Sequence, residues 1–534
     1  NNAKLIVEDR GTVTLNNTVL TSCDSMWQGV EVWGDKSKPQ YILNGQNWQG
    51  SLVMKRSTIE NARIAVALWR PNYYGTTGGI VKAENSVFRN NGKSVFACYY
   101  DNIHAVNGMI LDNVCRFDNC TFEINQDYEA DVMFYKHVDL ASVKGIKFNG
   151  CNFSVIQTEG VSPWNSGISS YNSGFKVNGY CSSAYLPCPD NSYTYSTFTG
   201  FNKGIYALGT GDVTDRTVSV MHSNFINNGT GVKLNLVTSS AICYSNFSIG
   251  LSLGDIYSCG DTATGYGIYC DNSSGFAIEE NDFRKASGAP TATYVGVYVS
   301  NSLSADEIFR NSFTGLSFGN VANFKNFKDD DPWAGLAYYC NQNSLNYEDF
   351  RVTDTSASVI QSTQGDVDHA AGNTFSPNAV YHFNNLGGRQ IGYYYYQNSP
   401  IEYPERVFHV TREPINIQNP CLPHYGNTGT SMRNLVLSAS QRSQTELEFN
   451  LASDEWTNVD VLYQSLVDGG NTQALLADVK GSYPEEMMTV YNQLLARSPH
   501  LSREVLFAVA DQTGVFPASA IFDIMMANPD ELKR

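Results

Sequence analysis

The chain has 534 residues, of which 16% are charged, and 35 Lys and Arg against 52 Asp and Glu give a net charge of −17. This negative charge argues against binding to nucleic acids or to anionic membrane surfaces. The length exceeds the ~250 to 300 residues that one globular core supports, so we expect growth by repetition or several domains. No apolar run is long enough to cross a bilayer, so we expect a protein that does not span a membrane.

The first 35 residues predict one complete coil of short strands. Alternating apolar residues occur at 5–7, 13–15, 19–20 and 26–34, separated by polar turns. The stretch MWQGVEVWG at 26–34 resembles the entry coils of right-handed parallel β-helix proteins secreted by Bacteroidota. The resemblance in repeat pattern extends over roughly residues 5 to 390. It implies a right-handed parallel β-helix, exported to the cell surface or beyond it.

An internal repeat is clearest between residues 217 and 254. Shifting this segment by 22 residues places Val220 on Ile242, Met221 on Cys243, Phe225 on Phe247 and Asn227 on Ile249. A short Asn/Ser-x-Phe unit recurs along the chain, with its aromatic residue at Phe88, Phe122, Phe153, Phe198, Phe225, Phe247, Phe283, Phe313 and Phe375. The number of residues between successive units varies, although the unit itself is constant. We therefore predict an all-β right-handed parallel β-helix, a solenoid with loops inserted at its corners, over residues 1–399.

The cysteines allow two interpretations. Three pairs could close surface loops as disulfides in an oxidising compartment: Cys115 with Cys120, Cys181 with Cys188, and Cys259 with Cys270. The pair Cys181 and Cys188, which brackets a short loop, is the best candidate. Alternatively, Cys120 and Cys151 stack inside the coils as buried thiols, since both lie two residues before the repeated Phe. No pair has the spacing of a structural zinc site.

The composition changes after Pro400. Four further prolines occur between residues 400 and 424, so we expect a Pro-rich β and linker segment over 400–450. The hydrophobic period then becomes helical, which predicts a small C-terminal α-helical bundle over 451–534, with helices at 454–467, 472–479, 484–496, 502–510 and 517–527. The last segment, 498–534, resembles one found near the C-terminal ends of Bacteroidota surface proteins exported by the type IX system. A sorting domain usually follows it in such proteins, so we expect a processed or truncated chain.

Two acidic clusters are candidates for chemistry. Asp329, Asp330 and Asp331 are consecutive, and Asp366 and Asp368 precede a histidine. Paired carboxylates could bind Ca²⁺ or act as acid and base in glycoside cleavage. Aspartate is also common in solvated turns, and this interpretation is favoured here. The acidic and basic stacking expected of a pectate-lyase-like enzyme is missing, so we predict no cofactor, with Ca²⁺ at Asp366 and Asp368 as the one alternative.

Aromatic residues outside the repeated core position are the second kind of candidate. Flat rings beside polar side chains suit a sugar-binding surface, although most such rings only pack insertions onto the coils. The candidate ligand-binding residues are Trp69, Tyr73, Tyr74, Trp164, Trp333, Tyr338 and Tyr339.

Three classes of function remain. We favour a non-catalytic, adhesin-like scaffold, extracellular or at the cell surface, that binds a glycan or another extracellular protein through aromatic corner loops. A polysaccharide lyase or glycoside hydrolase is the second class. The third is a structural subunit of an extracellular filament or secretion-associated complex, because solenoid sides offer flat faces for self-assembly or for contact with secretion machinery.

Overall fold

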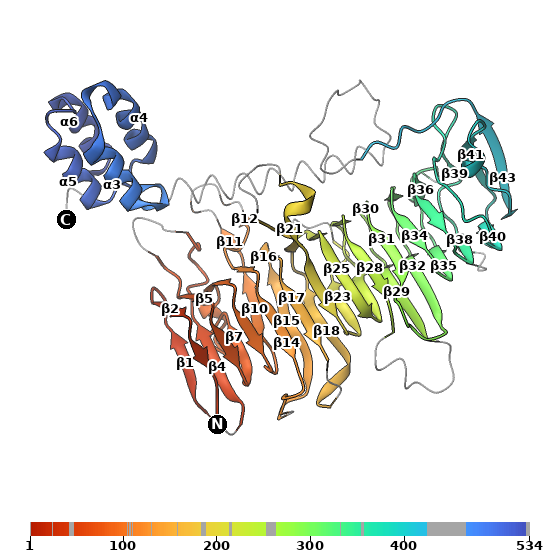
Figure 1. Ribbon diagram of the computed structural model, residues 1–534, viewed down its shortest axis with the longest axis horizontal. Helices are drawn as coiled ribbons and strands as arrows, with labels where there is room; N and C mark the ends of the chain where they lie inside the picture. The colour runs from red at the N-terminus through yellow and green to blue at the C-terminus, as the bar shows by residue number, and fades with distance from the viewer. Residues whose placement is uncertain are drawn as a thin grey trace.

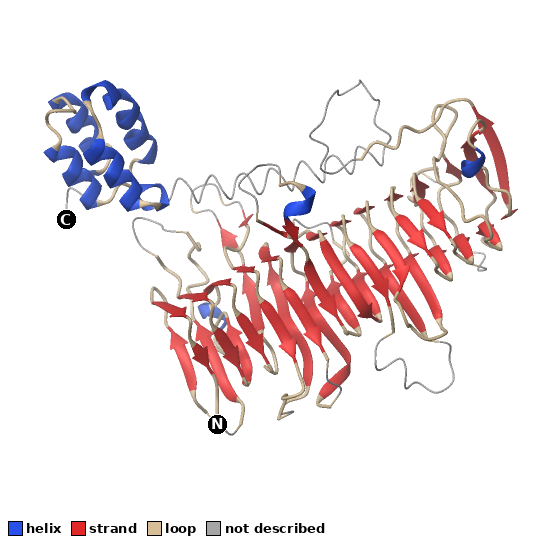
Figure 2. Cartoon of the chain, in the orientation of Figure 1, coloured by secondary structure: helices blue, strands red, loops and turns tan. Residues whose placement is uncertain are grey.

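The fold is a parallel β-helix followed by a small α-helical bundle, as predicted (Figures 1 and 2). The described residues contain four of the five helices expected in this bundle. The computed structural model describes residues 2–23, 25–41, 47–103, 105, 108, 110–129, 131–156, 159–182, 188–212, 216–251, 263–331, 333–353, 357–423 and 466–529. Three long sheets, called sheets A, B and C, form the coils, and each coil as far as β37 contributes one strand to each sheet. The last three strands of sheet A have no counterparts in sheets B and C. All pairings within these sheets are parallel, because the chain travels round the coil and returns beside its previous turn.

Sheet A is the longest of the three sheets and extends from one end of the solenoid to the other (Figure 1). Its strands are β1 (Lys4–Val7), β4 (Trp27–Val32), β7 (Ala62–Ala67), β10 (Val95–Tyr100), β15 (Phe134–Val143), β18 (Val161–Tyr171), β23 (Lys203–Leu208), β26 (Thr230–Asn235), β29 (Thr264–Asp271), β32 (Thr293–Ser300), β35 (Phe318–Asn323), β38 (Glu348–Val352), β40 (Tyr381–Asn385) and β42 (Val407–Phe408). Its last strand therefore lies beyond residue 399.

Sheets B and C complete each coil. Sheet B contains β2 (Thr12–Asn16), β5 (Ser51–Lys55), β8 (Ile80–Glu84), β13 (Arg116–Asp118), β16 (Ile146–Asn149), β19 (Phe175–Asn178), β24 (Val218–Met221), β27 (Ser240–Cys243), β30 (Phe276–Glu279), β33 (Glu307–Phe309) and β36 (Ala337–Tyr339). Sheet C contains β3 (Val19–Leu20), β6 (Thr58–Glu60), β9 (Val87–Arg89), β14 (Thr121–Ile124), β17 (Asn152–Val155), β22 (Ser196–Thr199), β25 (Ser223–Asn228), β28 (Asn246–Ile249), β31 (Asp282–Lys285), β34 (Ser312–Thr314) and β37 (Gln342–Ser344).

Smaller elements lie at the corners and at the C-terminal end of the solenoid. Two antiparallel hairpins pair β11 (Asn102–Ile103) with β12 (Ile110–Leu111), and β20 (Tyr180–Cys181) with β21 (Tyr193–Thr194). A short parallel sheet contains β39 (Thr363–Gln364), β41 (Ile391–Tyr396) and β43 (Val410–Ile415). Single 3₁₀ turns are η1 (Tyr74–Thr76), η2 (Asp190–Ser192) and η3 (Pro400–Glu402).

The 22-residue repeat corresponds to the register of neighbouring coils. Val220 pairs with Ile242, and Phe225 pairs with Phe247, as the sequence predicted. The expected match of Asn227 to Ile249 is wrong, because a bulge in β25 brings Asn228 opposite Ile249 instead. One extra residue on one strand displaces every later partner by one position.

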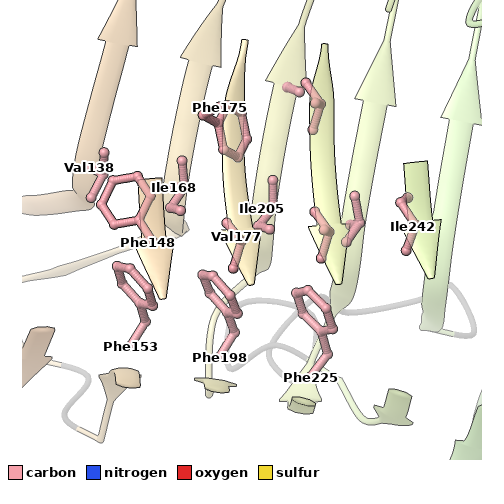
Figure 3. Packing of buried hydrophobic residues seen from close by; sticks show 14 of the residues in the cluster. Val138, Phe148, Phe153, Ile168, Phe175, Val177, Phe198, Ile205, Phe225 and Ile242 are labelled. Atoms are coloured by element: carbon pink, nitrogen blue, oxygen red, sulfur yellow. The ribbon is translucent and has the colours of Figure 1, made fainter. Parts of the chain in front are cut away.

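The repeated Phe residues form a continuous stack of rings inside the solenoid (Figure 3). Neighbouring rings from Phe88 to Phe313 are nearly parallel, with centroids 4.5 to 5.1 Å apart. This spacing is close to the ~4.8 Å between strands, so one ring per coil fills the core without gaps. Rings in neighbouring coils are thus packed face to face by the parallel register.

A column of glycines in sheet A faces the Phe stack. A Cβ added at Gly204, Gly231, Gly267 or Gly296 would lie 2.5 to 2.8 Å from Cδ1 of the Phe in the next coil. No side chain fits at this distance, so glycine is required for sheets A and C to approach each other. These four glycines are therefore part of the core.

A column of small polar residues follows the turns between sheets B and C. The main-chain N–H of Asn281 donates to Oδ1 of Asn311 at 3.0 Å, and Asn311 and Asn341 repeat this bond to the next coil. Cys120 and Cys151 occupy the same column as free, buried thiols. These side chains supply partners to turn amides that the sheets leave unpaired.

The disulfides differ in part from those predicted. Cys181 is joined to Cys188, as expected, and an unforeseen disulfide joins Cys340 to Cys421, which are 81 residues apart. The predicted bond between Cys115 and Cys120 is wrong, because both are free thiols buried in the core. Cys270 is also free and buried, and Cys259 lies outside the described residues. Inward-facing strand positions thus hold cysteine as a small hydrophobe.

The C-terminal helices are α3 (Thr472–Gly481), α4 (Met487–Arg497), α5 (Arg503–Asp511) and α6 (Ala518–Met526), with short turns η4 (Val467–Gly470) and η5 (Pro484–Glu486). The Asn471 and Ser502 side chains cap α3 and α5 by accepting main-chain N–H bonds. Apolar side chains from all four helices share one core. The helix expected at 454–467 lies almost wholly outside the described residues. Within the described parts of the chain, no helix has the length and apolar character needed to cross a membrane.

Candidate functional site

Three of the predicted aromatic residues are brought together at one corner. The ring centroids of Trp69 and Tyr74 are 5.0 Å apart, and Arg70 lies 4.0 Å from the ring centroid of Tyr73. Trp69 is only 8% exposed, whereas both tyrosines are exposed. Tyr74 also contacts Tyr99 from a neighbouring coil at 5.3 Å. The insertion therefore packs on the coil through Trp69 and presents two tyrosines to solvent.

Trp333, Tyr338 and Tyr339 do not form a common site. Trp333 is exposed, and its main-chain N–H donates to Oδ1 of Asp331, as in an Asx turn. Tyr338 is buried in the core, with its ring 4.8 Å from that of Phe350. Tyr339 is the next residue of β36 and therefore faces the opposite way. The expectation that Tyr338 reaches a ligand is corrected by its inward orientation.

Asp366 and Asp368 lie in a tight exposed turn. Oδ1 of Asp366 accepts the main-chain N–H groups of Asp368 and His369, both at 2.8 Å. This carboxylate thus stabilises its own turn, which is the ordinary use of aspartate in loops. In the described ranges, no group of three or more His, Cys, Asp or Glu side chains could hold a metal ion.

An ordered group of aromatic side chains lies on the outward face of sheet A. Tyr206, Lys233, Tyr269 and Tyr298 occupy one register position on the successive strands β23, β26, β29 and β32. Tyr266 lies beside them, 5.0 Å from Tyr269 between ring centroids. We call these five residues the tyrosine face. Because side chains alternate along a strand, the inward neighbours Ile205, Val232, Ile268 and Val297 fill the core beneath it.

The rings of the tyrosine face contact one another in a fixed arrangement. Tyr269 and Tyr298 are stacked, with centroids 4.5 Å apart and an interplanar angle of 18°. Tyr266 meets Tyr298 edge to face at 5.8 Å. These contacts hold the rings in one orientation. The side chains therefore lose their conformational entropy when the protein folds, and lose little more when a ligand binds.

Cations and polar groups surround these rings. Nζ of Lys233 lies 4.7 Å from the ring centroid of Tyr269, a cation–π distance. Nζ of Lys203 lies 5.7 Å from the ring centroids of both Tyr206 and Trp164. Trp164, one of the predicted ligand-binding residues, is 71% exposed and so extends the surface at its edge. Partial burial raises the pKa of Tyr269 and that of Tyr298, so both hydroxyls stay protonated.

A polar row borders the rings two residues further along each strand. Asn235, Asp271, Ser300 and Asn323 share this register position on β26, β29, β32 and β35. Their amide, carboxylate and hydroxyl groups offer both donors and acceptors. The surface therefore combines flat apolar rings with polar groups at their margin, which is the composition that a sugar ring requires.

Sequence analysis missed the four tyrosines of this face, although a signal is present. Gly204-Ile205-Tyr206, Gly267-Ile268-Tyr269 and Gly296-Val297-Tyr298 repeat one pattern, a core glycine, an inward aliphatic residue and an outward tyrosine. The predicted ligand-binding aromatics lie in or near corner insertions, and the strands that carry these tyrosines were predicted only as core. Alternation with period 2, counted from the inward aliphatic residue, would have placed Tyr206, Tyr269 and Tyr298 on the outside.

Two ionisable groups with strongly perturbed pKa values serve the core rather than a reaction. Burial raises the pKa of Asp306 to about 7, and its carboxylate accepts bonds from the Ser302 hydroxyl and the Phe276 main-chain N–H. Burial lowers the pKa of His137 to about 3, and Nε2 lies 3.3 Å from the carbonyl oxygen of Ser154. Both groups satisfy buried polar atoms of neighbouring coils.

Comparison of this chain with protein-family models, curated proteins and solved structures finds no match in any of the three. The fold is established by the three parallel sheets themselves. The likeness to secreted proteins of Bacteroidota stays an expectation from the sequence. What the chain binds has to be inferred from its own surface.

Proposed function

We propose that this protein is a non-catalytic, adhesin-like scaffold that binds a glycan on the tyrosine face of sheet A. The observation that supports this proposal is the alignment of Tyr206, Tyr269 and Tyr298 in one register position, with stacked rings and a polar border. Rings ordered before binding lose little entropy when a sugar stacks on them. The proposal moves the binding surface from the corner loops to the flat side of the solenoid.

An extracellular or cell-surface location is part of the proposal. Two disulfides support it, because disulfides persist in oxidising compartments and are rare in reducing ones. A glycan of the cell surface or extracellular matrix would meet the protein there. Export of the kind found in Bacteroidota belongs to the same proposal and rests on the sequence resemblance alone.

Glycan-array binding followed by calorimetry tests the proposal. Tyr269→Ala and Tyr298→Ala should each weaken binding of an array-positive glycan by about 10-fold or more, as loss of ~1.5 kcal/mol of ring contact implies. Tyr73→Ala is the matched control, since Tyr73 is an exposed tyrosine in a corner insertion. Loss of binding in Tyr73→Ala but not in Tyr269→Ala would show that the glycan binds at the corner loops instead.

Two further outcomes would replace the proposal by another class of function. Robust release of reducing ends or unsaturated products from a polysaccharide would assign an enzyme. Concentration-dependent polymerisation that Tyr269→Ala abolishes, without any glycan binding, would assign a structural subunit whose flat face contacts a second copy.

A further inference from the structure

A pocket of about 370 Å³ lies beside the turns that join sheets B and C near the C-terminal end of the solenoid. One wall is formed by the segment 416–423, which follows β43 and returns across the coils. The disulfide from Cys421 to Cys340 fixes this segment, and Asn419 Nδ2 donates to the carbonyl oxygen of Ala370 at 3.1 Å. The volume lies in the range of small-molecule sites.

Glycine at 372 is required by this closure. A Cβ there would lie 2.9 Å from Sγ of Cys421 and 3.1 Å from Sγ of Cys340, and the residue has a φ of 71°. Both the conformation and the space exclude a side chain. The pocket wall is thus held by the disulfide between Cys340 and Cys421, and glycine at 372 leaves the space that this disulfide needs.

Glu402, in η3, is the buried ionisable residue of the pocket lining. It is 4% exposed, and its Oε1 accepts a bond from Nε2 of Gln418 at 3.0 Å. No donor among the described residues reaches its Oε2. A buried carboxylate oxygen without a donor is costly, by ~1 to 3 kcal/mol or more. A ligand that supplies the missing donor would remove this cost.

The charge of the pocket indicates the kind of donor. Arg310 and Glu280 also line it, and Nε of Arg310 lies 2.6 Å from Oε1 of Glu280. Arg310 further donates to the carbonyl oxygen of Cys421. Its charge is therefore engaged by Glu280, and two carboxylates face one guanidinium in the lining. A cationic donor complements this imbalance better than a neutral one.

We propose that this pocket binds a monosaccharide-sized ligand that carries an ammonium group, such as a hexosamine. The ammonium group donates to Oε2 of Glu402, and the side chains of Gln342, Thr374 and Ser399 are within the same lining to bond hydroxyl groups. A metal ion fits less well, because the described residues contain no cluster of three or more metal-ligating side chains. This site is separate from the tyrosine face, so the proposal for the pocket does not depend on glycan binding at that face.

Calorimetric titration with three probes tests the proposal. Glucosamine should bind at least 10-fold more tightly than glucose, which matches its size without the charge. 1,4-Diaminobutane carries two ammonium groups and no sugar ring, and should bind more weakly than glucosamine in spite of its higher charge. Glu402→Gln should weaken glucosamine binding at least 10-fold while keeping the bond from Gln418, and Glu405→Gln, a nearby exposed site, should leave it unchanged.

The opposite results are equally clear. Absence of glucosamine binding to the wild-type chain, or equal binding by Glu402→Gln, overturns the proposal. Equal or tighter binding of 1,4-diaminobutane overturns the sugar part and assigns a polyamine. Should Glu402→Gln fail to fold, Cys421→Ser leaves the carboxylate in place but releases the wall, and must weaken glucosamine binding several-fold. An unchanged affinity in that variant also overturns the proposal.

Discussion

The contact between the glycine column and the Phe stack makes Gly231→Ala a sharp test of the core. The new Cβ would lie 2.6 Å from the carbonyl oxygen of Gly267 and 2.7 Å from Cδ1 of Phe247. Carbon atoms ordinarily approach no closer than ~3.5 Å in favourable packing. One neighbour is main chain hydrogen-bonded in sheet A, and the other is a ring stacked on both sides, so neither can yield easily.

The expected cost follows from two opposing terms. Overpacking of a core by one methyl group costs ~1 to 3 kcal/mol. Replacing glycine restricts the unfolded chain and returns ~0.4 to 1 kcal/mol. Because two rigid groups meet the same methyl group, we place the overpacking term at the upper end. The free energy of unfolding should therefore fall by ~2 kcal/mol.

Urea unfolding followed by circular dichroism, together with amide exchange at Val232 and Ile268, measures this effect locally as well as globally. Gly75→Ala is the control, since a Cβ at Gly75 has no neighbour within 4 Å. A Phe247→Leu background should reduce the cost of Gly231→Ala, because part of the clash is with the ring. If Gly231→Ala is as stable as Gly75→Ala, the close approach of sheets A and C is refuted.

Other predictions concern buried polar groups and covalent links. Burial raises the pKa of Asp306 from its ordinary 3.8 to about 7, so the folded state keeps a proton that the unfolded chain loses. The contribution of Asp306 to the free energy of unfolding should thus be highest below about pH 4 and fall as the pH rises to about 7. Asp306→Asn should reduce the fall of stability over this range in urea titrations across pH, and the part due to Asp349, whose pKa burial raises to about 6, should remain. Asn311→Ala leaves the main-chain N–H of Asn281 without its acceptor, and should cost ~1 to 3 kcal/mol by thermal unfolding. Non-reducing peptide mapping should recover Cys340 linked to Cys421, and free thiols there would contradict the closure of segment 416–423.

Much of the fold could be predicted because the repeat acts at short range. The match of Phe225 to Phe247 in sequence became their pairing in sheet C. Each coil imposes its register on the next through side chains that must stack, so aligned residues in sequence become neighbours in space. The predicted partner of Ile249 was wrong by one residue, because a bulge in β25 brings Asn228 opposite it. The hydrophobic pattern of the sequence does not reveal such a bulge.

The candidate sites were predicted less well. Trp69, Tyr73 and Tyr74 are close in sequence, and the structure brings them together at one corner. Tyr338 and Tyr339 were treated alike, although consecutive strand residues face opposite sides. Which of two consecutive tyrosines faces the core depends on where the strand begins. The two residues themselves do not indicate that position.

The amino-acid sequence by itself determined the coiled architecture, the aligned aromatic core and the change to helices near the C-terminus, because periodicity and propensity are local properties. Tertiary structure alone decided which surfaces exist. The tyrosine face needs four coils in register, and the pocket at Glu402 needs a segment 81 residues beyond Cys340 to return and bond to it. Contacts between such distant residues follow from the path of the whole chain, which no local pattern records.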